Sequence, residues 1–194
     1  THVELSKGSK FFSMGLDIGG GIVRNNLNVV TEGEDSYCSV NGIYITSGSQ
    51  HVDNKVVINH NSSYTTSREL YKGILAGKSK AIFHGSIVVQ EGLKQIDALQ
   101  IDKNLLLSDQ AQANTKPAFW IYSDDVKCGH GAASGQIDRD AIFYLTSRGI
   151  GESDARNLLV KGFVQEVIES IPDKFYKNKM NNMVNASLLD ILGI

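Results

Sequence analysis

Residues 37–49 have the sequence Tyr37-Cys-Ser-Val-Asn-Gly-Ile-Tyr-Ile-Thr-Ser-Gly-Ser49. Two clusters of β-branched and aromatic residues, Tyr37–Val40 and Ile43–Ile45, alternate here with glycine and polar residues. Residues of the first kind are enriched in strands, whereas Gly, Asn and Ser mark turns. The stretch therefore predicts short strands, with turns at Asn41-Gly42 and at Ser47-Gly48-Ser49.

The same pattern extends in both directions, over residues 1 to about 135. Further strand-like clusters are Ile22-Val23, Leu27–Val30, Val56–Ile58, Ile82-Phe83, Ile87–Val89 and Phe119–Tyr122, and Gly19-Gly20-Gly21 is a further predicted turn. Many short strands without helices between them indicate a sandwich, a barrel or a solenoid. We find no strict repeat that chooses among the three. The chain has only 2 Pro beside 19 Gly, and because proline removes a donor from a strand ladder, this scarcity slightly favours a solenoid.

After Gly135 the apolar residues change to a helical spacing. Asp138 is placed to cap a first helix, and Arg148-Gly149 to end it, because glycine adopts the left-handed conformation at a helix end. A second helix is predicted to begin near Gly151, and a third to have Pro172 in its first turn. Their apolar stripes are Leu158, Leu159, Phe163, Val164, Val167, Ile168 and Ile171 in the second helix, and Tyr176, Met180, Val184, Leu188 and Ile191 in the third. The sequence thus predicts a β domain over residues 1–136 and a helical domain over residues 137–194.

Charge and cysteine usage exclude several classes of function. The chain carries 19 Lys and Arg against 21 Asp and Glu, so it lacks the basic excess of a nucleic-acid-binding or acidic-lipid-binding surface. No apolar segment approaches the roughly 18 residues of a membrane span. The two cysteines, Cys38 and Cys128, do not make a disulfide framework and indicate reduced thiols. The first residues resemble the interior of a protein, so we expect the chain to be part of a longer one.

The segment Lys127-Cys-Gly-His-Gly131 places two potential metal-ligating side chains, a cysteine and a histidine, close together. In an extended strand, Cys128 and His130 point to the same face, where a thiolate and an imidazole are able to share an iron or zinc ion. Two ligands do not close a coordination sphere, because a structural zinc site needs about four. Any metal here would therefore need ligands from elsewhere or from a partner chain. A buried cysteine beside a structural histidine is the competing interpretation.

Other candidates carry less support. A hydrolase triad of His60, Ser67 and Asp53 lacks the Gly-x-Ser-x-Gly elbow. The glycines of Gly15–Gly21 lack the Gly-Lys-Ser/Thr ending of a phosphate-binding loop. Asp124-Asp125 is better explained as a solvated pair than as a cation site. Cys38 is most simply a core residue.

The residues resemble a known family in several places at once. The stretch Thr115–Asp138, which includes Asp-Asp-Val-Lys-Cys-Gly-His-Gly131, and Phe143–Gly149 (Phe-Tyr-Leu-Thr-Ser-Arg-Gly) are similar to the SufB/SufD family of iron–sulfur cluster assembly proteins. Gly131 follows His130 where SufB sequences tend to carry Glu, so the chain is most similar to the SufD branch. Upstream matches are Val52-Asp-Asn54, Asn59-His60, Ser67-Arg68, Tyr71-Lys-Gly73, Phe83-His-Gly85 and Asn104–Ser108.

The resemblance implies a right-handed parallel β-helix followed by a small C-terminal helical domain. It also implies a non-catalytic scaffold subunit that pairs with a SufB-like subunit through the β-helix and binds a SufC-like ATPase through the helices. A homodimer is a further option, because like strand edges can pair. No tightly bound cofactor is implied, only a transient iron–sulfur cluster. The implied compartment is the bacterial cytoplasm, with an organellar equivalent left open.

The resemblance also assigns roles to residues. His130 falls on the family histidine associated with cluster formation at the SufB–SufD interface, where it would contact iron together with a partner-chain cysteine. Cys128 matches a family cysteine of less certain role. Phe143, Arg148 and Arg156 are candidate partner-binding residues of the helices. A carbohydrate-active β-helix and a purely structural adaptor remain as alternatives, although the acidic residues are scattered rather than gathered along one groove.

Overall fold

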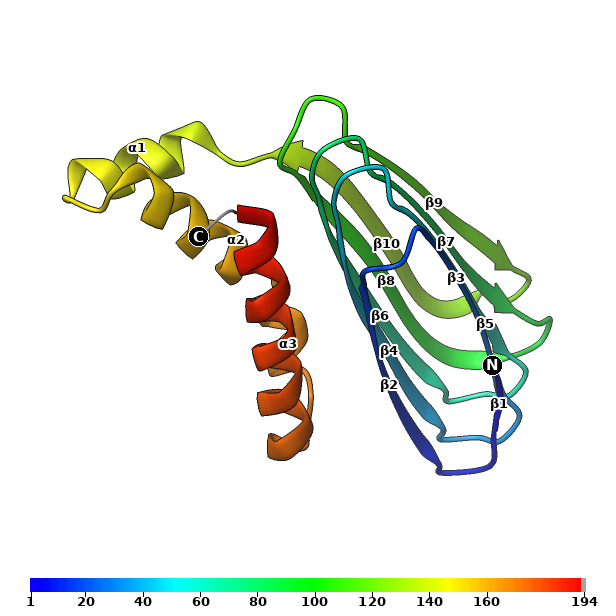
Figure 1. The fold of residues 1–194 in the computed structure, drawn as a ribbon. Helices are drawn as coiled ribbons and strands as arrows, with labels where there is room; N and C mark the ends of the chain where they lie inside the picture. The colour runs from blue at the N-terminus through cyan, green and yellow to red at the C-terminus, as the bar shows by residue number, and fades with distance from the viewer. Residues whose placement is uncertain (193–194) are drawn as a thin grey trace.

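The computed structural model describes residues 1–192, which form a parallel β-solenoid followed by three helices (Figure 1). The strands are β1 (His2–Leu5), β2 (Lys10–Ile18), β3 (Ile22–Thr31), β4 (Tyr37–Thr46), β5 (His51–His60), β6 (Thr66–Leu75), β7 (Lys80–Val89), β8 (Lys94–Leu106), β9 (Gln112–Ile121) and β10 (Asp125–Gln136). The helices are α1 (Arg139–Ser147), α2 (Glu152–Glu169) and α3 (Lys174–Leu192). Of the three architectures that the strand pattern left open, the chain adopts the solenoid.

The solenoid has about five turns, and each turn gives one strand to each of two sheets. The strand orders are β1-β3-β5-β7-β9 and β10-β8-β6-β4-β2, so each strand pairs with the strand two places along the chain. All of these pairs are parallel. Parallel in-register pairing places equivalent residues of successive turns in columns that run along the solenoid axis.

In the middle turns of the solenoid, paired residues of neighbouring strands are separated by a constant number of residues. Ile22 pairs with His51 and His51 with Lys80, so each of these turns adds 29 residues. Tyr37 pairs with Thr66 at the same spacing. Later turns lengthen, because Thr66 pairs with Asp97 and Lys80 with Gln112. These unequal turns explain why the sequence shows no strict repeat.

The predicted turn at Asn41-Gly42 is wrong, because both residues lie inside β4 and are buried. Glycine is required there by packing between turns. A Cβ on Gly42 would overlap the Tyr71 ring of the neighbouring strand, and a Cβ on Gly73 would overlap the ring of Tyr44. Each tyrosine fills the space left by a glycine that is its register partner. The predicted turns at Gly19–Gly21 and Ser47–Ser49 do connect strands.

All of the strand-like clusters fall in strands, except that Tyr122 follows the end of β9. The sequence pattern missed β1, β2, β6, β8 and β10; the inward faces of β6 and β8 carry buried polar residues such as Glu69 and Gln100. Pro117 lies in β9, which is the last strand of its sheet, and an edge strand is where proline is tolerated.

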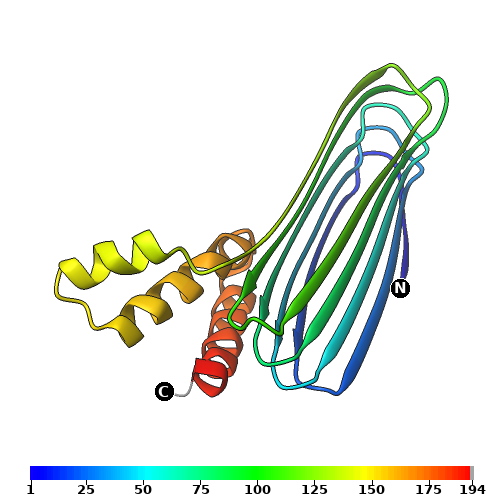
Figure 2. The same ribbon diagram turned by 90° about the horizontal axis from the view of Figure 1, so that it is seen from above.

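The helices α2 and α3 cover the outer face of the sheet that contains β4 and β6 (Figure 2). Ile43, Ile45 and Ile74 of this face pack against the helices in one cluster. Its helical members are Val160, Val164, Val167, Ile168, Val184 and Leu188. Burying such side chains contributes about 1.5–3 kcal/mol each, so the helices and the sheet stabilise each other.

A buried lysine fastens α2 to the sheet. The Lys72 ammonium of β6 donates a hydrogen bond to the Phe163 carbonyl at 2.6 Å and pairs with the Glu166 carboxylate at 2.7 Å. It also lies 5.0 Å from the centre of the Phe163 ring. A lysine is rarely buried unless its charge is paired, and these contacts satisfy it.

The helix ends follow the predicted signals in the first two helices. The Asp138 side chain accepts a hydrogen bond from the Asp140 backbone N–H, which caps α1. Gly149 has φ +87° after the C-cap Arg148, and Ile150 N–H donates to the Leu145 carbonyl in a Schellman arrangement. The helix α2 begins at Glu152 after the N-cap Gly151.

Two details of the helices differ from the prediction. Pro172 precedes α3, and Asp173 caps this helix by accepting a hydrogen bond from the Tyr176 N–H. Leu158 of the predicted stripe is 54% exposed, whereas Val160, absent from that stripe, is fully buried. None of the helices within residues 1–192 is both long and apolar enough to cross a membrane. The strands end at Gln136 and the first helix begins at Arg139, while the division into domains at 136/137 stays a prediction.

Candidate functional site

Cys128 and His130 lie on β10, the last strand of its sheet. The strand is extended through both residues, so the expected i, i+2 placement on one face is confirmed. The Cys128 side chain is half-buried and packs against the cluster formed by Ile87, Val89, Ile96 and Ala98. His130 is exposed to solvent. The pair therefore lies at the rim of the last turn, with only the histidine fully accessible.

An aromatic ring of the opposite sheet fixes one side of His130. The centre of the Phe119 ring lies 4.5 Å from the centre of the imidazole, with an interplanar angle of 52°. Phe119 belongs to β9, which together with β10 forms the last turn. A tilted contact at this distance is a favourable aromatic geometry. It restricts the ring of His130 while leaving the residue open to a partner.

The electrostatic environment of Cys128 is dominated by burial. Burial raises the pKa of the Cys128 thiol, although a hydrogen bond with the backbone of Ala98 acts in the opposite direction. The thiol therefore carries its proton at neutral pH, and the thiolate is the form that binds metals. Cys38 is a fully buried core residue, as expected, and burial raises its pKa to about 12. His130 is accordingly the better candidate ligand of this pair.

The local ligands are too few to hold a metal by themselves. Within residues 1–192, no group of three or more His, Cys, Asp or Glu side chains is placed to hold an ion. That a metal at His130 would take further ligands from elsewhere or from a partner chain stays a prediction. Asp124 and Asp125 are both exposed at the start of β10.

The interior of the solenoid contains a polar cluster that the sequence did not single out. Asp102 accepts hydrogen bonds from Tyr44, Asn104 and Thr115, which come from three different strands. Glu69 and Gln100 are register partners that lie close to this cluster and are also buried. Burial and the nearby Asp102 raise the pKa of Glu69 well above its usual value, although a hydrogen bond with the Gln100 side chain acts in the opposite direction. The one sequence signal for this arrangement is that Glu69, Gln100 and His130 follow one another at intervals close to the length of one solenoid turn.

Of the three residues of the possible hydrolase triad, His60 and Ser67 are in contact but buried, and Asp53 has a different partner. His60 hydrogen-bonds through Nε2 with the Ser67 hydroxyl at 3.0 Å and through Nδ1 with Thr65 at 2.7 Å. Both His60 and Ser67 are fully buried. Asp53 pairs instead with Arg24, at 3.5 Å. This histidine ends β5 and satisfies buried hydroxyl groups.

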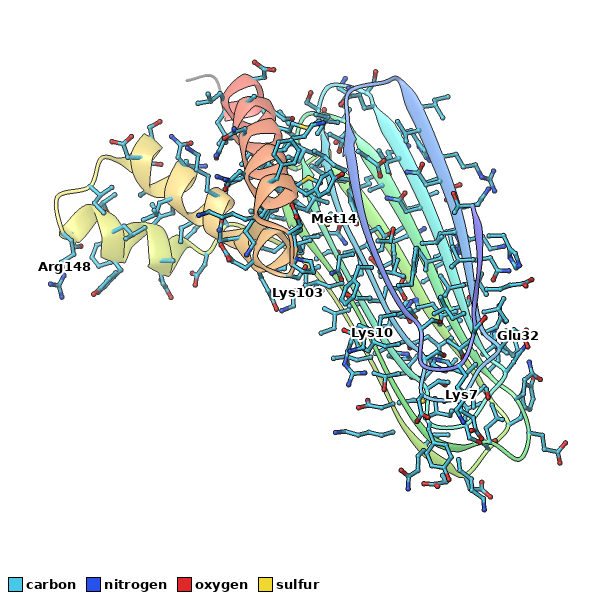
Figure 3. The ribbon with its side chains drawn as sticks, turned by 90° about the horizontal axis from the view of Figure 1, so that it is seen from below. Lys7, Lys10, Met14, Glu32, Lys103 and Arg148 are labelled. Atoms are coloured by element: carbon cyan, nitrogen blue, oxygen red, sulfur yellow. The ribbon has the colours of Figure 1, made fainter. Side chains whose placement is uncertain are left out.

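The three partner-binding candidates of the helices lie on the hairpin formed by α1 and α2. Phe143 is 72% exposed, and the Arg148 guanidinium lies 5.2 Å from the centre of the Tyr144 ring. Arg156 pairs with Glu152 at 3.1 Å. Arg148 marks the end of the hairpin, which projects away from the solenoid (Figure 3). Tyr144 and Leu158 are also exposed there, so the hairpin presents apolar as well as cationic groups.

The chain is a parallel β-solenoid followed by three helices, with an exposed histidine on the last strand of the solenoid. Residues 1–163 match the model of a protein family described as "SUF system FeS cluster assembly, SufBD core domain". The chain therefore belongs to the SufB/SufD family, and within it the chain is most like SufD.

Individual relatives support this assignment. The chain is 35% identical over 176 residues to the iron–sulfur cluster assembly protein SufD of Escherichia coli, a match that covers 91% of this chain and 42% of that protein. It is 31% identical over 186 residues to an iron–sulfur cluster assembly SufBD family protein of Synechocystis, covering 96% and 41%. It is 33% identical over 191 residues to a chloroplastic protein of Arabidopsis thaliana, covering 97% and 40%. The chain thus spans about two fifths of the length of these relatives.

Proposed function

We propose that this chain is the scaffold part of a SufD-like subunit in iron–sulfur cluster assembly, and that it is not itself a catalyst. In this proposal, His130 contacts iron or a nascent cluster, which is the cargo of the assembly. A SufB-like partner pairs with the edge strands of the last turn and supplies a further ligand. Family membership supports the role in the SUF system.

The observation that carries this proposal is the placement of His130. It is an exposed imidazole on an edge strand, in contact with Phe119, at a position where residues 1–192 supply too few ligands for a metal. An edge strand presents unpaired backbone groups to which another chain can add. A neutral imidazole is a common ligand for iron. The histidine and the pairing surface therefore lie on the same strand.

The test is cluster reconstitution with His130→Ala. The protein is combined with SufB-like and SufC-like subunits, iron and a sulfide source, and the cluster is followed by its visible absorbance. We expect assembly of the subunits to persist and the cluster yield to fall at least tenfold. His84→Ala is the matched control, because His84 lies on the outward face of β7. An unchanged yield with His130→Ala would refute the role of this histidine.

We further propose that the α1–α2 hairpin binds the SufC-like ATPase. Phe143, Arg148 and the neighbouring exposed apolar residues form the contact surface. Deleting all the helices would uncover the apolar face of Ile43, Ile45 and Ile74, so point substitutions are the better test. Phe143→Ser with Arg148→Glu should abolish co-purification of the ATPase, whereas Lys179→Glu on α3 should not. Retention of the ATPase by the double variant would contradict this assignment.

A purely structural adaptor is the second candidate, and the same reconstitution separates it from a scaffold. If the chain is only an adaptor, His130→Ala should change neither the assembly of the subunits nor the cluster yield. A homodimer through the edge strands β9 and β10 stays a prediction, as does the bacterial cytoplasm or an organelle as the compartment. The family assignment leaves no support for the carbohydrate-active alternative.

A further inference from the structure

The outward face of β3, β5, β7 and β9 differs in charge from the chain as a whole. Its side chains are the alternate residues of each strand that point away from the core. The charged residues among them are the cationic Arg24, Lys55, Lys80 and Lys116 and a single carboxylate, Asp53. The whole chain has a net charge of −2, so positive charge is concentrated on this face.

Nothing within residues 1–192 covers this face. The helices α2 and α3 pack against the sheet that contains β4 and β6, and Figure 1 shows all three helices on that side of the solenoid. Lys55 and Lys116 are exposed, and so is Trp120, near the end of β9. The face is therefore open to another molecule.

Only one cation of this face is neutralised within it. Arg24 and Asp53 are register partners and form an ion pair at 3.5 Å. In the described part of the chain, Lys55, Lys80 and Lys116 form no ion pair. A lysine on an edge strand opposes aggregation, which explains Lys116 on β9. Lys55 and Lys80 lie on the central strands β5 and β7, where lysine is disfavoured, so edge protection does not explain them.

The unpaired lysines lie beside apolar side chains. Lys55 pairs with His84, and His84 pairs with Lys116, so two strand spacings, about 10 Å, separate the two lysines. Four residues after Lys116 on β9 is Trp120, whose register partner is Val88. The Trp120 side chain is 55% exposed. The face thus presents cations together with an exposed aromatic ring.

We propose that this face binds an acidic, amphipathic segment of a partner protein. Carboxylates of that segment pair with Lys55 and Lys116, and one of its apolar side chains packs on the ring of Trp120. Complementary charge orients and selects such a partner, and tryptophan is enriched among the residues on which an interface depends. A nucleic acid fits less well, because three unpaired lysines on an acidic chain are few for a phosphate backbone.

This surface is separate from the contacts proposed above. The SufB-like subunit is assigned to the strand edges of the last turn, and the SufC-like ATPase to the α1–α2 hairpin. The basic face lies on the outside of the other strands, so it remains open in such an assembly. Binding to it is measurable on the isolated chain, without iron, sulfide or another subunit, so the scaffold role and this contact are able to fail independently.

The test uses the fluorescence of Trp120, the only tryptophan of the chain. A synthetic helical peptide of Glu and Leu should shift the emission to shorter wavelength, because the bound peptide buries the ring. The same peptide with Lys in place of Glu should leave the emission unchanged, and added salt should weaken binding of the acidic peptide because it screens the charges. Lys55→Glu with Lys116→Glu should lower the affinity at least tenfold, because like charges then oppose each other.

The matched control is Lys161→Glu with Lys179→Glu, which makes the same change of charge at exposed positions of α2 and α3. This control should bind the acidic peptide as the unmodified chain does, and circular dichroism verifies that both double variants are folded.

Several results would overturn the proposal. An unshifted emission, an equal shift with the Lys peptide, or an equal loss in the two double variants would exclude a charge-selective contact at this face. Tighter binding of a thymidine oligonucleotide than of the acidic peptide would make a nucleic acid the partner. Self-association in analytical ultracentrifugation that Lys55→Glu with Lys116→Glu abolishes would make a second copy of the chain the occupant.

Discussion

The solenoid and the α1–α2 hairpin differ in how they use large side chains. In the solenoid, Tyr44 and Phe83 are each 1% exposed, and the glycines beside them leave no free space. In α1 no residue is buried, and Phe143 and Tyr144 face solvent. Tyr44 and Phe83 thus stabilise the solenoid interior, whereas Phe143 and Tyr144 of the hairpin are exposed. Substitutions in the two regions should therefore affect different measurements.

The largest effects are expected in the interior of the solenoid, beginning with the glycines between turns. Gly73→Val should lower the free energy of unfolding by about 3 kcal/mol or prevent folding, because the new side chain overlaps Tyr44 and Asn104. Urea denaturation followed by circular dichroism measures the change. Gly135→Ala is the control, since a Cβ there meets no neighbour. Equal losses in both variants would show that glycine packing does not set the stability of the solenoid.

A pH-dependent effect of similar size is expected from His60. Burial lowers the pKa of His60 to about 4, from 6.5. Above pH 6.5 the ring is neutral in both states; between pH 6.5 and 4 the unfolded chain takes up a proton that the folded chain does not. Stability should fall by about 3 kcal/mol across this range.

Comparison with His60→Asn isolates this contribution. The variant keeps a hydrogen-bonding side chain but removes the titrating group, so its unfolding free energy should fall less steeply between pH 6.5 and 4. Parallel curves for the two proteins would mean that His60 takes up its proton without unfolding.

A smaller effect is expected where α2 meets the sheet. The hydrogen bond from Lys72 lowers the pKa of Glu166 below 4.5. This contribution is therefore complete at neutral pH and is lost as the pH falls through the lowered value. Glu166→Gln should reduce stability at pH 7 by about 1 kcal/mol or less, because the carboxylate is 59% exposed.

Hydrogen exchange of the α2 amides is the measurement for Glu166. Faster exchange at pH 7 is expected in Glu166→Gln but not in Glu152→Gln, which alters the ion pair within the hairpin. At a pH well below the titration of Glu166, the variant and the unmodified chain should no longer differ.

The smallest effect is expected on the hairpin. Phe143→Ser should change the unfolding free energy by no more than about 0.5 kcal/mol, because the ring is exposed. Phe83→Ala should cost about 3–5 kcal/mol. A large loss in Phe143→Ser would show that the hairpin contributes to the fold rather than to binding.

The sequence was informative where one local rule decides the structure. The capping of α1 by Asp138 and its end at Gly149 follow from neighbouring residues. The strand β6 was missed because its inward face carries Ser67, Glu69, Tyr71 and Gly73, which do not form an apolar alternation. Their burial follows from pairing with strands about 29 residues away, which the local pattern does not contain.

The candidate site was predictable in part for the same reason. That Cys128 and His130 share a face follows from strand geometry over three residues. That Phe119 contacts the imidazole, and that Glu69 and Gln100 lie in the same column, depends on the register between turns. The Cys128 side chain packs against residues of two other strands, β7 and β8, which no spacing near it indicates.

In β4 and β6, a glycine of each strand pairs with a tyrosine of the other, and these two pairs also help to fix the register between the strands. Sliding one strand by a single residue would turn apolar side chains outward, and hydrophobic patterning alone opposes this. Sliding by two residues preserves the inward and outward pattern, so patterning does not oppose it. A slide in one direction would place Tyr44 opposite Tyr71, and a slide in the other would place Gly42 opposite Gly73, so in both cases the two glycines would lose the rings that fill the space beside them. The two glycine–tyrosine pairs thus oppose a two-residue shift of the register between β4 and β6, and so help to maintain the columns of residues that end at His130.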